Sequence, residues 1–258
     1  MSSDFDGQVA EGFALPFSGW DFSAISGRWR EGDPPWNYAE LLREQIRSAQ
    51  SMVDLGTGGG EFLASLAPLP PTTFATEGYP PNVALARRNL APLGVRVLST
   101  GANLRLDLSD RSLDLVADRH EEFSASEVYR VLRPGGWFIT QQVGARNNLE
   151  FRQKFGVPSP RPTNDVSNAE RLADEVAGAG LTVRRKEEAT YSTEFGDIGA
   201  VVFYLRAVPW EVPGFSLGRD RERLKEIDDG IRRTGSFRVT AHRLLIVAQC
   251  LARRSGHR

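Results

Sequence analysis

Cysteine and histidine are scarce in this chain of 258 residues. Cys250 is the only cysteine, and His120, His242 and His257 are the only histidines. A single cysteine excludes an internal disulfide and every zinc site built from several cysteines, and three scattered histidines argue against a site built from histidine alone. We therefore expect no structural metal.

Long apolar runs are also missing. The longest nearly apolar stretch covers residues 199–205, far below the ~20 residues that a membrane-spanning helix needs. Residues 1–10 are acidic and lack the apolar segment of a secretory leader. These features predict a cytoplasmic protein with no membrane partner.

The chain carries no excess of either charge. Its 32 lysine and arginine residues stand against 33 acidic ones, which gives a formal net charge of -1, and 40% of its residues are hydrophobic. Nucleic-acid-binding domains usually show a basic excess, so the balance argues against a nucleic-acid partner. The composition is that of a globular protein, and the length fits one large domain or a domain with an insertion.

Short apolar runs alternate with helical patterns along most of the chain. The runs predict strands at 51–55, 73–76, 95–98, 113–117, 137–142, 181–191 and 237–250. The periodic patterns predict helices at 38–49, 61–66, 81–90, 125–132, 168–180, 197–207 and 218–233. Alternation through the middle of the chain is typical of a parallel sheet with helices on both faces.

Residues 52–63 contain the strongest motif, a buried strand that ends in an acid, followed by a glycine-rich loop and a helix. Gly56 and Gly58 allow the backbone to approach a ligand, and the free N–H groups that open the helix favour an anionic group. A dinucleotide fingerprint would place a glycine where this chain has Glu61 and an apolar residue where it has Asp54. The loop is therefore wrong for a pyrophosphate, and a purely structural turn is the alternative to a ligand site.

A second acid ends the next predicted strand. Glu77 lies 21 residues after Gly56, where a doubly wound sheet brings the end of the second strand beside the first. Its carboxylate could accept hydrogen bonds from both hydroxyls of a ribose. A solvent-exposed loop acid is the alternative.

A third motif follows at residues 112–116 and 127–139, where a strand and a helix lead through the tight turn at 133–136 into another strand. With these three motifs in this order, residues 52–143 resemble the class I S-adenosylmethionine-dependent methyltransferases, especially the type 11 group. The resemblance implies an α/β fold, a doubly wound, Rossmann-like sheet of seven strands with the last strand antiparallel. It also implies S-adenosyl-L-methionine as the cofactor.

The resemblance implies cofactor-binding residues at the ends of the first four strands. They are Asp54, Gly56, Thr57 and Gly58 at the methionine end, Glu77 and Gly78 at the ribose, Ala102 and Asn103 at the adenine, and Asp118. The family often has an acid where this chain has Ala102. Adenine recognition would therefore use the backbone there or the amide of Asn103.

The predicted acceptor side is less clearly marked. His120 follows the fourth strand and could take a proton from the acceptor as a general base, or could be structural. Gln141 and Gln142 close the fifth strand, where side chains alternate between faces, so one of them should reach the rim of the pocket; an amide at the sheet edge is the alternative. Trp36 and Tyr38 could wall the site or pack in a core, and Trp210 could line the acceptor site or anchor its own loop.

The sequence thus predicts a methyltransferase that moves a methyl group to an O, N or C nucleophile of a small molecule. An RNA base methyltransferase and a non-methylating, cofactor-binding descendant of the fold stay open as alternatives. We predict one domain over residues 1–258, with an N-terminal helical cap at 1–48, a cofactor-binding half at 51–143 and a substrate-side half at 144–258. The last part includes a helical insertion at 195–235, before the final strand. The oligomeric state is left open.

Overall fold

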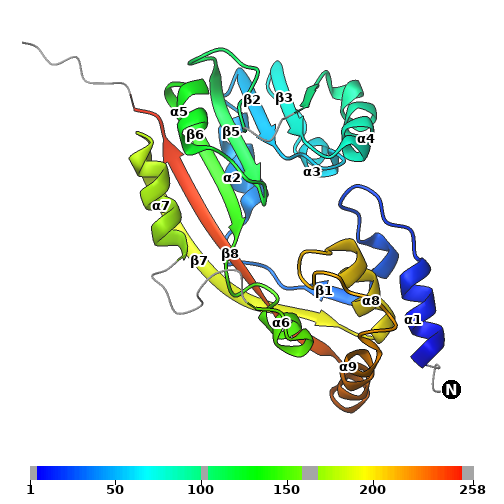
Figure 1. Cartoon of the computed structure of the whole chain (residues 1–258). Coiled ribbons are helices and arrows are strands. Elements are labelled where there is room, and N and C mark those ends of the chain that lie inside the picture. Colours follow the sequence, from blue (N-terminus) through cyan, green and yellow to red (C-terminus); the bar gives the residue numbers. More distant parts are fainter. Residues whose placement is uncertain (1–4, 100–103, 159–167, 252–258) are drawn as a thin grey trace, which may run out of the picture. The chain divides into compact units, whose positions relative to one another are not determined.

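The computed structural model of the chain describes residues 5–99, 104–158 and 168–251 (Figure 1). These residues form two compact units. The first unit comprises Met1–Pro35, Ala145–Asp165 and Ala189–His242, and the second comprises Trp36–Gly144, Val166–Glu188 and Arg243–Arg258. The predicted single domain and its three regions stay a prediction.

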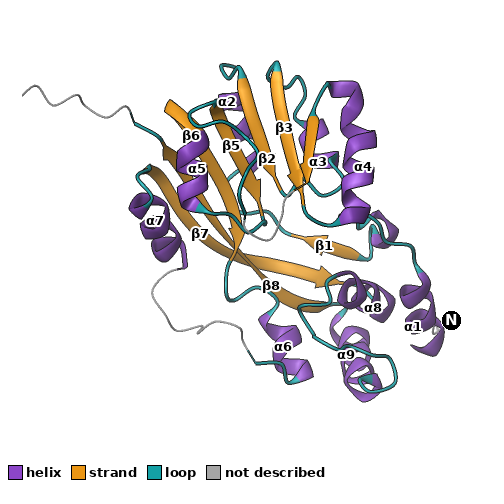
Figure 2. Cartoon of the chain, turned by 45° about the horizontal axis from the view of Figure 1, so that its top comes forward, coloured by secondary structure: helices purple, strands orange, loops and turns teal. Residues whose placement is uncertain are grey.

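The strands of the described residues form one sheet of eight, in the order β1-β7-β8-β6-β5-β2-β3-β4 (Figure 2). Their bounds are β1 Trp29–Glu31, β2 Ser51–Leu55, β3 Thr72–Glu77, β4 Arg96–Ser99, β5 Leu113–Arg119, β6 Leu132–Val143, β7 Thr182–Phe195 and β8 Phe237–Gln249. Strands β2 to β6 pair in parallel, and β8 runs antiparallel to β6. The doubly wound, Rossmann-like α/β fold with an antiparallel last strand is therefore confirmed.

One strand was not predicted, so the sheet has eight strands rather than seven. The short strand β1 pairs antiparallel with the end of β7, and its central residue Arg30 lies opposite Glu194. A segment of three residues carries no alternation that a sequence could reveal. It becomes a strand only because a distant edge offers it hydrogen-bond partners.

Nine α-helices are described: α1 Phe5–Ala14, α2 Tyr38–Ile46, α3 Glu61–Ser65, α4 Pro80–Leu90, α5 Ala125–Val131, α6 Leu149–Phe155, α7 Asn168–Gly178, α8 Ile198–Ala207 and α9 Arg221–Thr234. Short 3-10 turns lie at Ser23–Ile25 and Ala91–Leu93. Polar caps set several of the starts. The Asn37 side chain accepts a hydrogen bond from the Glu40 N–H, and Asp197 accepts one from the Ala200 N–H, which satisfies N–H groups that have no partner within the helix.

Side chains alternate between the two faces of the central strand β2. Val53 and Leu55 join a buried cluster with residues of α5 and α7, such as Val128 and Val176. Asp54 therefore points to the opposite face, the side of the sheet on which α2 packs against β5 and β6. Helices thus cover both faces of this part of the sheet, and Asp54 lies on the same face as α2.

The predicted tight turn at 133–136 is an irregularity inside β6. Leu113 pairs with Leu132, and the next pair is Leu115 with Trp137, so extra residues of β6 are accommodated between the two pairs. Gly135 has a φ of +92° in this segment, a conformation that glycine adopts without steric cost. The strand therefore begins earlier than its apolar run suggests.

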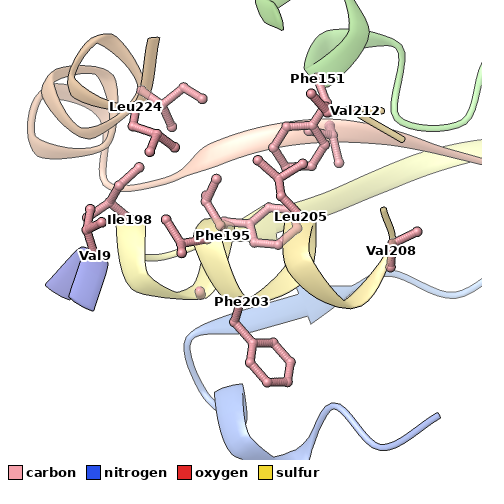
Figure 3. Close-up of a cluster of buried hydrophobic side chains, with 14 of the residues drawn as sticks. Val9, Phe151, Phe195, Ile198, Phe203, Leu205, Val208, Val212 and Leu224 are labelled. Atoms are coloured by element: carbon pink, nitrogen blue, oxygen red, sulfur yellow. The ribbon is translucent and has the colours of Figure 1, made fainter. Parts of the chain in front are cut away.

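The first unit has its own core around α8. Figure 3 shows Phe203 on one side of this helix and Leu205 and Ile198 on the other. Phe203 meets the rings of Phe17 and Phe22 edge on, with centroid distances of 5.8 and 6.2 Å. Because α8 is apolar around most of its surface, it is buried on several sides.

Helix α1 packs closely on α8 in the same unit. A methyl group at Gly12 would lie 2.1 Å from the carbonyl oxygen of Gly199, so the two helices touch through glycine. The Arg28 guanidinium lies beside this contact and bonds to Asp197 and Glu11, each at 2.7 Å. These contacts fix α1; within the predicted N-terminal cap, the sequence pattern predicts a helix only at 38–49.

Candidate functional site

The glycine-rich loop between β2 and α3 adopts the conformation that its glycines predict. Gly56 and Gly58 have φ values of +60° and +62°, in the left-handed region that favours glycine. The Gly56 N–H donates to the Thr76 hydroxyl at 3.1 Å, and the Thr57 N–H donates to the Thr76 carbonyl at 2.8 Å. The loop is thus tied to the end of β3, beside β2 in the sheet.

Two carboxylates lie at the ends of neighbouring strands next to this loop. Asp54 of β2 is buried, and burial raises its pKa to about 6, against smaller lowering effects of the nearby Thr57 hydroxyl and of the Arg119 charge. The Thr57 hydroxyl lies near Asp54 without a well-placed hydrogen bond. Asp118 of β5 pairs with Leu55, the next residue along β2. The charge of Asp54 lies close enough to Asp118 to affect its pKa.

Asp118 is completely buried, with 0% of its surface exposed. Its Oδ1 accepts hydrogen bonds from the Gln142 amide at 3.0 Å and from the Glu121 N–H at 3.2 Å. Its Oδ2 is buried without a hydrogen-bond partner among the described residues. Burial and, to a smaller extent, the charge of Asp54 raise its pKa well above the ordinary value. A carboxylate in this state would be stabilised by a cationic ligand.

Two further acids approach the same loop. Glu77 at the end of β3 is buried, and its Oε1 accepts a hydrogen bond from the Tyr79 N–H at 2.8 Å, across the exposed residue Gly78. The Glu121 side chain lies against Gly56, where a methyl group would come within 2.4 Å of its Oε2. Partial burial and the charge of Glu77 raise the pKa of Glu121. The loop is therefore surrounded by acidic groups.

Tyr38, predicted on the acceptor side, binds backbone groups of β5 and β6. Its hydroxyl lies 2.8 Å from the Asp118 carbonyl oxygen and 3.2 Å from that of Ile139, and it accepts from the Asp118 N–H at 3.1 Å. Its ring stacks on Phe62 of α3. Burial, with the charges of Asp54 and Asp118, raises the pKa of the phenol well above its ordinary value. Tyr38 therefore stays protonated and fixes the strand end that carries Asp118.

The other predicted acceptor residues of the second unit form a chain of hydrogen bonds. The indole N–H of Trp36 donates to Gln141 Oε1 at 2.8 Å, and Gln141 Nε2 lies 3.1 Å from His120 Nε2. The His120 backbone has a φ of +70°, a strained value for a residue with a side chain, and such strain clusters at functional sites. Protein atoms around the ring shield it from water, and this desolvation lowers the pKa of His120 most. The charges of Arg243 and Arg119 lower it further. Solvent still reaches the residue.

Three of the predicted residues lie elsewhere. Trp210 belongs to the first unit, is 57% exposed and stacks on Trp20 with ring centroids 5.8 Å apart. Ala102 and Asn103 lie outside the described residues.

The sequence did not single out the roles of Gln142 and Glu121. Gln142 also bonds to the Glu121 carbonyl and the Thr140 hydroxyl, at 2.9 and 3.0 Å, so it binds together the segment after β5. The adjacent glutamines at this strand end are its signal in the sequence, because alternation directs only one of the two side chains toward the glycine-rich loop.

Neither a metal cluster nor a membrane-spanning helix is found in the part of the chain that the structure describes. No three histidine, cysteine or acidic side chains of these residues are grouped to hold a metal ion. No helix among them is both long and apolar enough to cross a bilayer.

Residues 53–140 match the family model described as a methyltransferase domain. No curated protein matches the chain. Solved structures share its fold at low sequence identity. A candidate methyltransferase from Bacillus halodurans C-125 has a TM-score of 0.59 and 15% identity, over 84% of this chain and 99% of that one.

Two more similar structures are the YcgJ protein from Bacillus subtilis and the [4+2]-cyclase SpnF. YcgJ has a TM-score of 0.55 and 16% identity, over 83% of this chain and 98% of its own. SpnF has a TM-score of 0.52 and 15% identity, over 96% of this chain and 92% of its own. At these identities the structural likeness establishes the fold, while the family model covers β3 to β5, most of β2 and β6, the glycine loop and the acids described above. Residues 53–140 are therefore similar to a methyltransferase domain of the S-adenosylmethionine-dependent kind, and the chain shares its fold with solved structures that include a candidate methyltransferase.

Proposed function

We propose that the chain moves a methyl group from S-adenosylmethionine to an oxygen, nitrogen or carbon nucleophile of a small molecule. When bound, the cofactor supplies an electrophilic methyl group on a positively charged sulfur. The chain's own residues then need to bind and orient the two reactants and exclude water, because alignment supplies much of the rate in such a transfer. The near-zero net charge favours a small acceptor over a nucleic acid.

One observation carries the proposal, the buried acid pair Asp54 and Asp118 beside the glycine loop. The pair includes one carboxylate oxygen that has no partner among the described residues, and burial raises the pKa of both groups. The cofactor carries a sulfonium and an ammonium group, so its positive charges fit a site built from carboxylates. The acid pair thus fits the group that the fold family implies.

We assign the remaining cofactor roles to residues at the same sheet edge. Gly56, Thr57 and Gly58 would face the methionine end, since their backbone can be approached closely. The Glu77 carboxylate would accept hydrogen bonds from the ribose hydroxyls, with Gly78 beside them. Ala102 and Asn103 remain the predicted contacts of the adenine.

The acceptor residues are proposed as Trp36, Tyr38, Gln141 and Trp210, with His120 as the group that touches the reacting molecule. In the second unit, Tyr38 and Trp36 would act through the groups they position, because their polar atoms already bond to the protein. His120 combines a strained backbone with a residue surface that solvent reaches.

The cofactor half of the proposal is tested by the variant Asp118→Asn, with Asp174→Asn on the exposed face of α7 as the matched control. Calorimetry with S-adenosylmethionine should show at least tenfold weaker binding for the first and unchanged binding for the second, since a charged hydrogen bond contributes about 1.5–3 kcal/mol. Equal affinity of both variants would contradict the assignment.

The transfer itself is tested with methyl-labelled cofactor and extracts of candidate small molecules. We expect label in an acceptor and an equal amount of S-adenosylhomocysteine. SpnF, which shares the fold, is named as a cyclase, so a non-methylating descendant is the second candidate function. Cofactor binding without any S-adenosylhomocysteine would favour that candidate, and salt-dependent retention of RNA would favour an RNA substrate.

The low cysteine content leads us to propose a cytoplasmic location as well. Fractionation of cells that express the tagged protein would test it.

A further inference from the structure

The hydrogen bonds from Trp36 through Gln141 to His120 fix which atom donates and which accepts at each step. An indole N–H can only donate, so the Gln141 atom that lies 2.8 Å from it is the carbonyl oxygen. The amide nitrogen of Gln141 must then face His120 Nε2, at 3.1 Å. An amide NH2 group also only donates, so Nε2 of His120 accepts.

This polarity decides where the imidazole carries its proton. A neutral imidazole has one N–H and one acceptor nitrogen. With Nε2 as the acceptor, the proton lies on Nδ1. Nδ1 has no hydrogen-bond partner among the described residues, and the residue is exposed.

The backbone holds the ring in the same place. The His120 N–H donates to the Gln141 carbonyl oxygen at 2.9 Å, and Arg119, the preceding residue, pairs with Gln141 in the sheet. Gln141 thus contacts His120 through both its backbone and its side chain. Gln141 and Trp36 are themselves buried, which leaves the amide little freedom to rotate.

We propose that Trp36 and Gln141 are positioning residues that hold His120 as the Nδ1–H tautomer, so that His120 offers a hydrogen-bond donor to an oxygen of the acceptor molecule. The acceptor would present a lone pair there, as a carboxylate, carbonyl or deprotonated hydroxyl oxygen does. This inference rests on the proposed function and names the chemistry that its acceptor side would recognise.

The same chain argues against His120 as a general base at Nε2. A proton taken up there would place an N–H opposite the Gln141 NH2 group. If the amide rotated to avoid this, its NH2 group would face the indole N–H of Trp36 instead. Arg243 and Arg119 are the charged groups whose fields reach the ring among the described residues, and both oppose a positive charge on it.

The inference is tested by nitrogen NMR of the full chain labelled with 15N-histidine, which distinguishes protonated from unprotonated ring nitrogens. At neutral pH we expect His120 to show a protonated Nδ1 and an unprotonated Nε2. His242 is an internal reference of the opposite kind, because its Nδ1 accepts from the Arg146 N–H at 3.1 Å. Single replacement of each histidine assigns the signals.

Two variants test what causes the tautomer. In Gln141→Glu a carboxylate, which only accepts, faces the ring, so the His120 proton should move to Nε2. In Trp36→Phe the amide loses the group that orients it, so both tautomers should appear. The His242 signal should stay unchanged in each variant.

An Nε2–H tautomer of His120 in the unaltered protein would overturn the inference, even if neither variant folds. An unaltered tautomer in folded Gln141→Glu would show that Gln141 does not set it. Because these signals are read without cofactor or acceptor, a failure to transfer methyl groups would leave the result standing. The failure of one proposal is therefore distinguishable from the failure of the other.

Discussion

Replacing Asp54 by asparagine should stabilise the cofactor-free protein. Burial raises the pKa of Asp54 from 3.8 to about 6, so the ionised carboxylate costs the folded state about 3 kcal/mol relative to the unfolded chain. Asparagine has nearly the same shape and carries no charge. At pH 7.5 Asp54→Asn should therefore be more stable by up to about 3 kcal/mol.

The sign of this effect depends on pH in a definite way. A carboxyl with a raised pKa binds more protons in the folded than in the unfolded state between pH 3.8 and 6, so stability falls as pH rises through that window. The cost is absent below the unfolded pKa and complete above the folded one. The advantage of Asp54→Asn should accordingly shrink to about 1.5 kcal/mol at pH 5.

Urea denaturation of the unaltered protein, Asp54→Asn and the control Asp174→Asn at pH 7.5 and pH 5 would measure these differences. The control lies on an exposed face of α7 and should change stability by less than about 0.5 kcal/mol at either pH. The reasoning is refuted if Asp54→Asn is less stable at pH 7.5, or if its advantage is equal at both pH values. The stabilised variant should bind the cofactor more weakly, since the site would lose a charge that serves binding.

Two further changes test other parts of the structure. Glu77→Gln should weaken binding of S-adenosylmethionine by about ten- to a hundredfold in equilibrium dialysis, because a neutral amide replaces the charged group that accepts hydrogen bonds from the ribose hydroxyls. Glu175→Gln, exposed on α7, is its control. Equal affinities of the two variants would count against the role of Glu77. Gly12→Ala should expose α1 to limited proteolysis, since its methyl would lie 2.1 Å from the Gly199 carbonyl oxygen, whereas Gly230→Ala in α9 meets open space and should stabilise by about 0.5–1 kcal/mol. Equal resistance of the two alanine variants would show that α1 does not need the glycine contact.

The strand, glycine-rich loop and helix at residues 51–65 could be predicted because their signals are local. Short segments of the sequence contain an apolar strand, the glycines of the loop and an acid at each of two strand ends. The structure shows Asp54 and Glu77 buried and Gly56 and Gly58 at positive φ. Sheet geometry then brings the ends of parallel strands to one edge. Neighbouring positions in the sequence were sufficient for that inference.

The connections of the acceptor side could not be predicted because they depend on register. Sheet pairing sets Asp118 opposite Thr140 and Arg119 opposite Gln141, and only this register brings Gln141 to His120 and Gln142 to Asp118. Alternation suggested that one glutamine would face the site, whereas the structure engages both with the segment that follows β5.

Elements without a pattern of their own were missed for a related reason. The three residues Trp29–Glu31 become strand β1 only through pairing with β7. Helix α6, Leu149–Phe155, is a short helix whose Phe151 packs on Phe195 and Tyr204, at centroid distances of 5.4 and 5.9 Å. Tertiary contacts stabilise such short segments, and no single window of the sequence contains them.

Proton release on cofactor binding is the most direct measurement of the central claim, that buried acids of β2 and β5 hold the positive charge of S-adenosylmethionine. At pH 6 Asp54, with a pKa of about 6, is roughly half protonated in the free protein. Binding of a cation should therefore release about half a proton from this residue alone. Calorimetry in buffers of different ionisation enthalpy measures the number of protons released. Asp54→Asn should bind the cofactor more weakly and release fewer protons. Binding that releases no protons and is unchanged in Asp54→Asn, or the lack of any binding, would contradict the account.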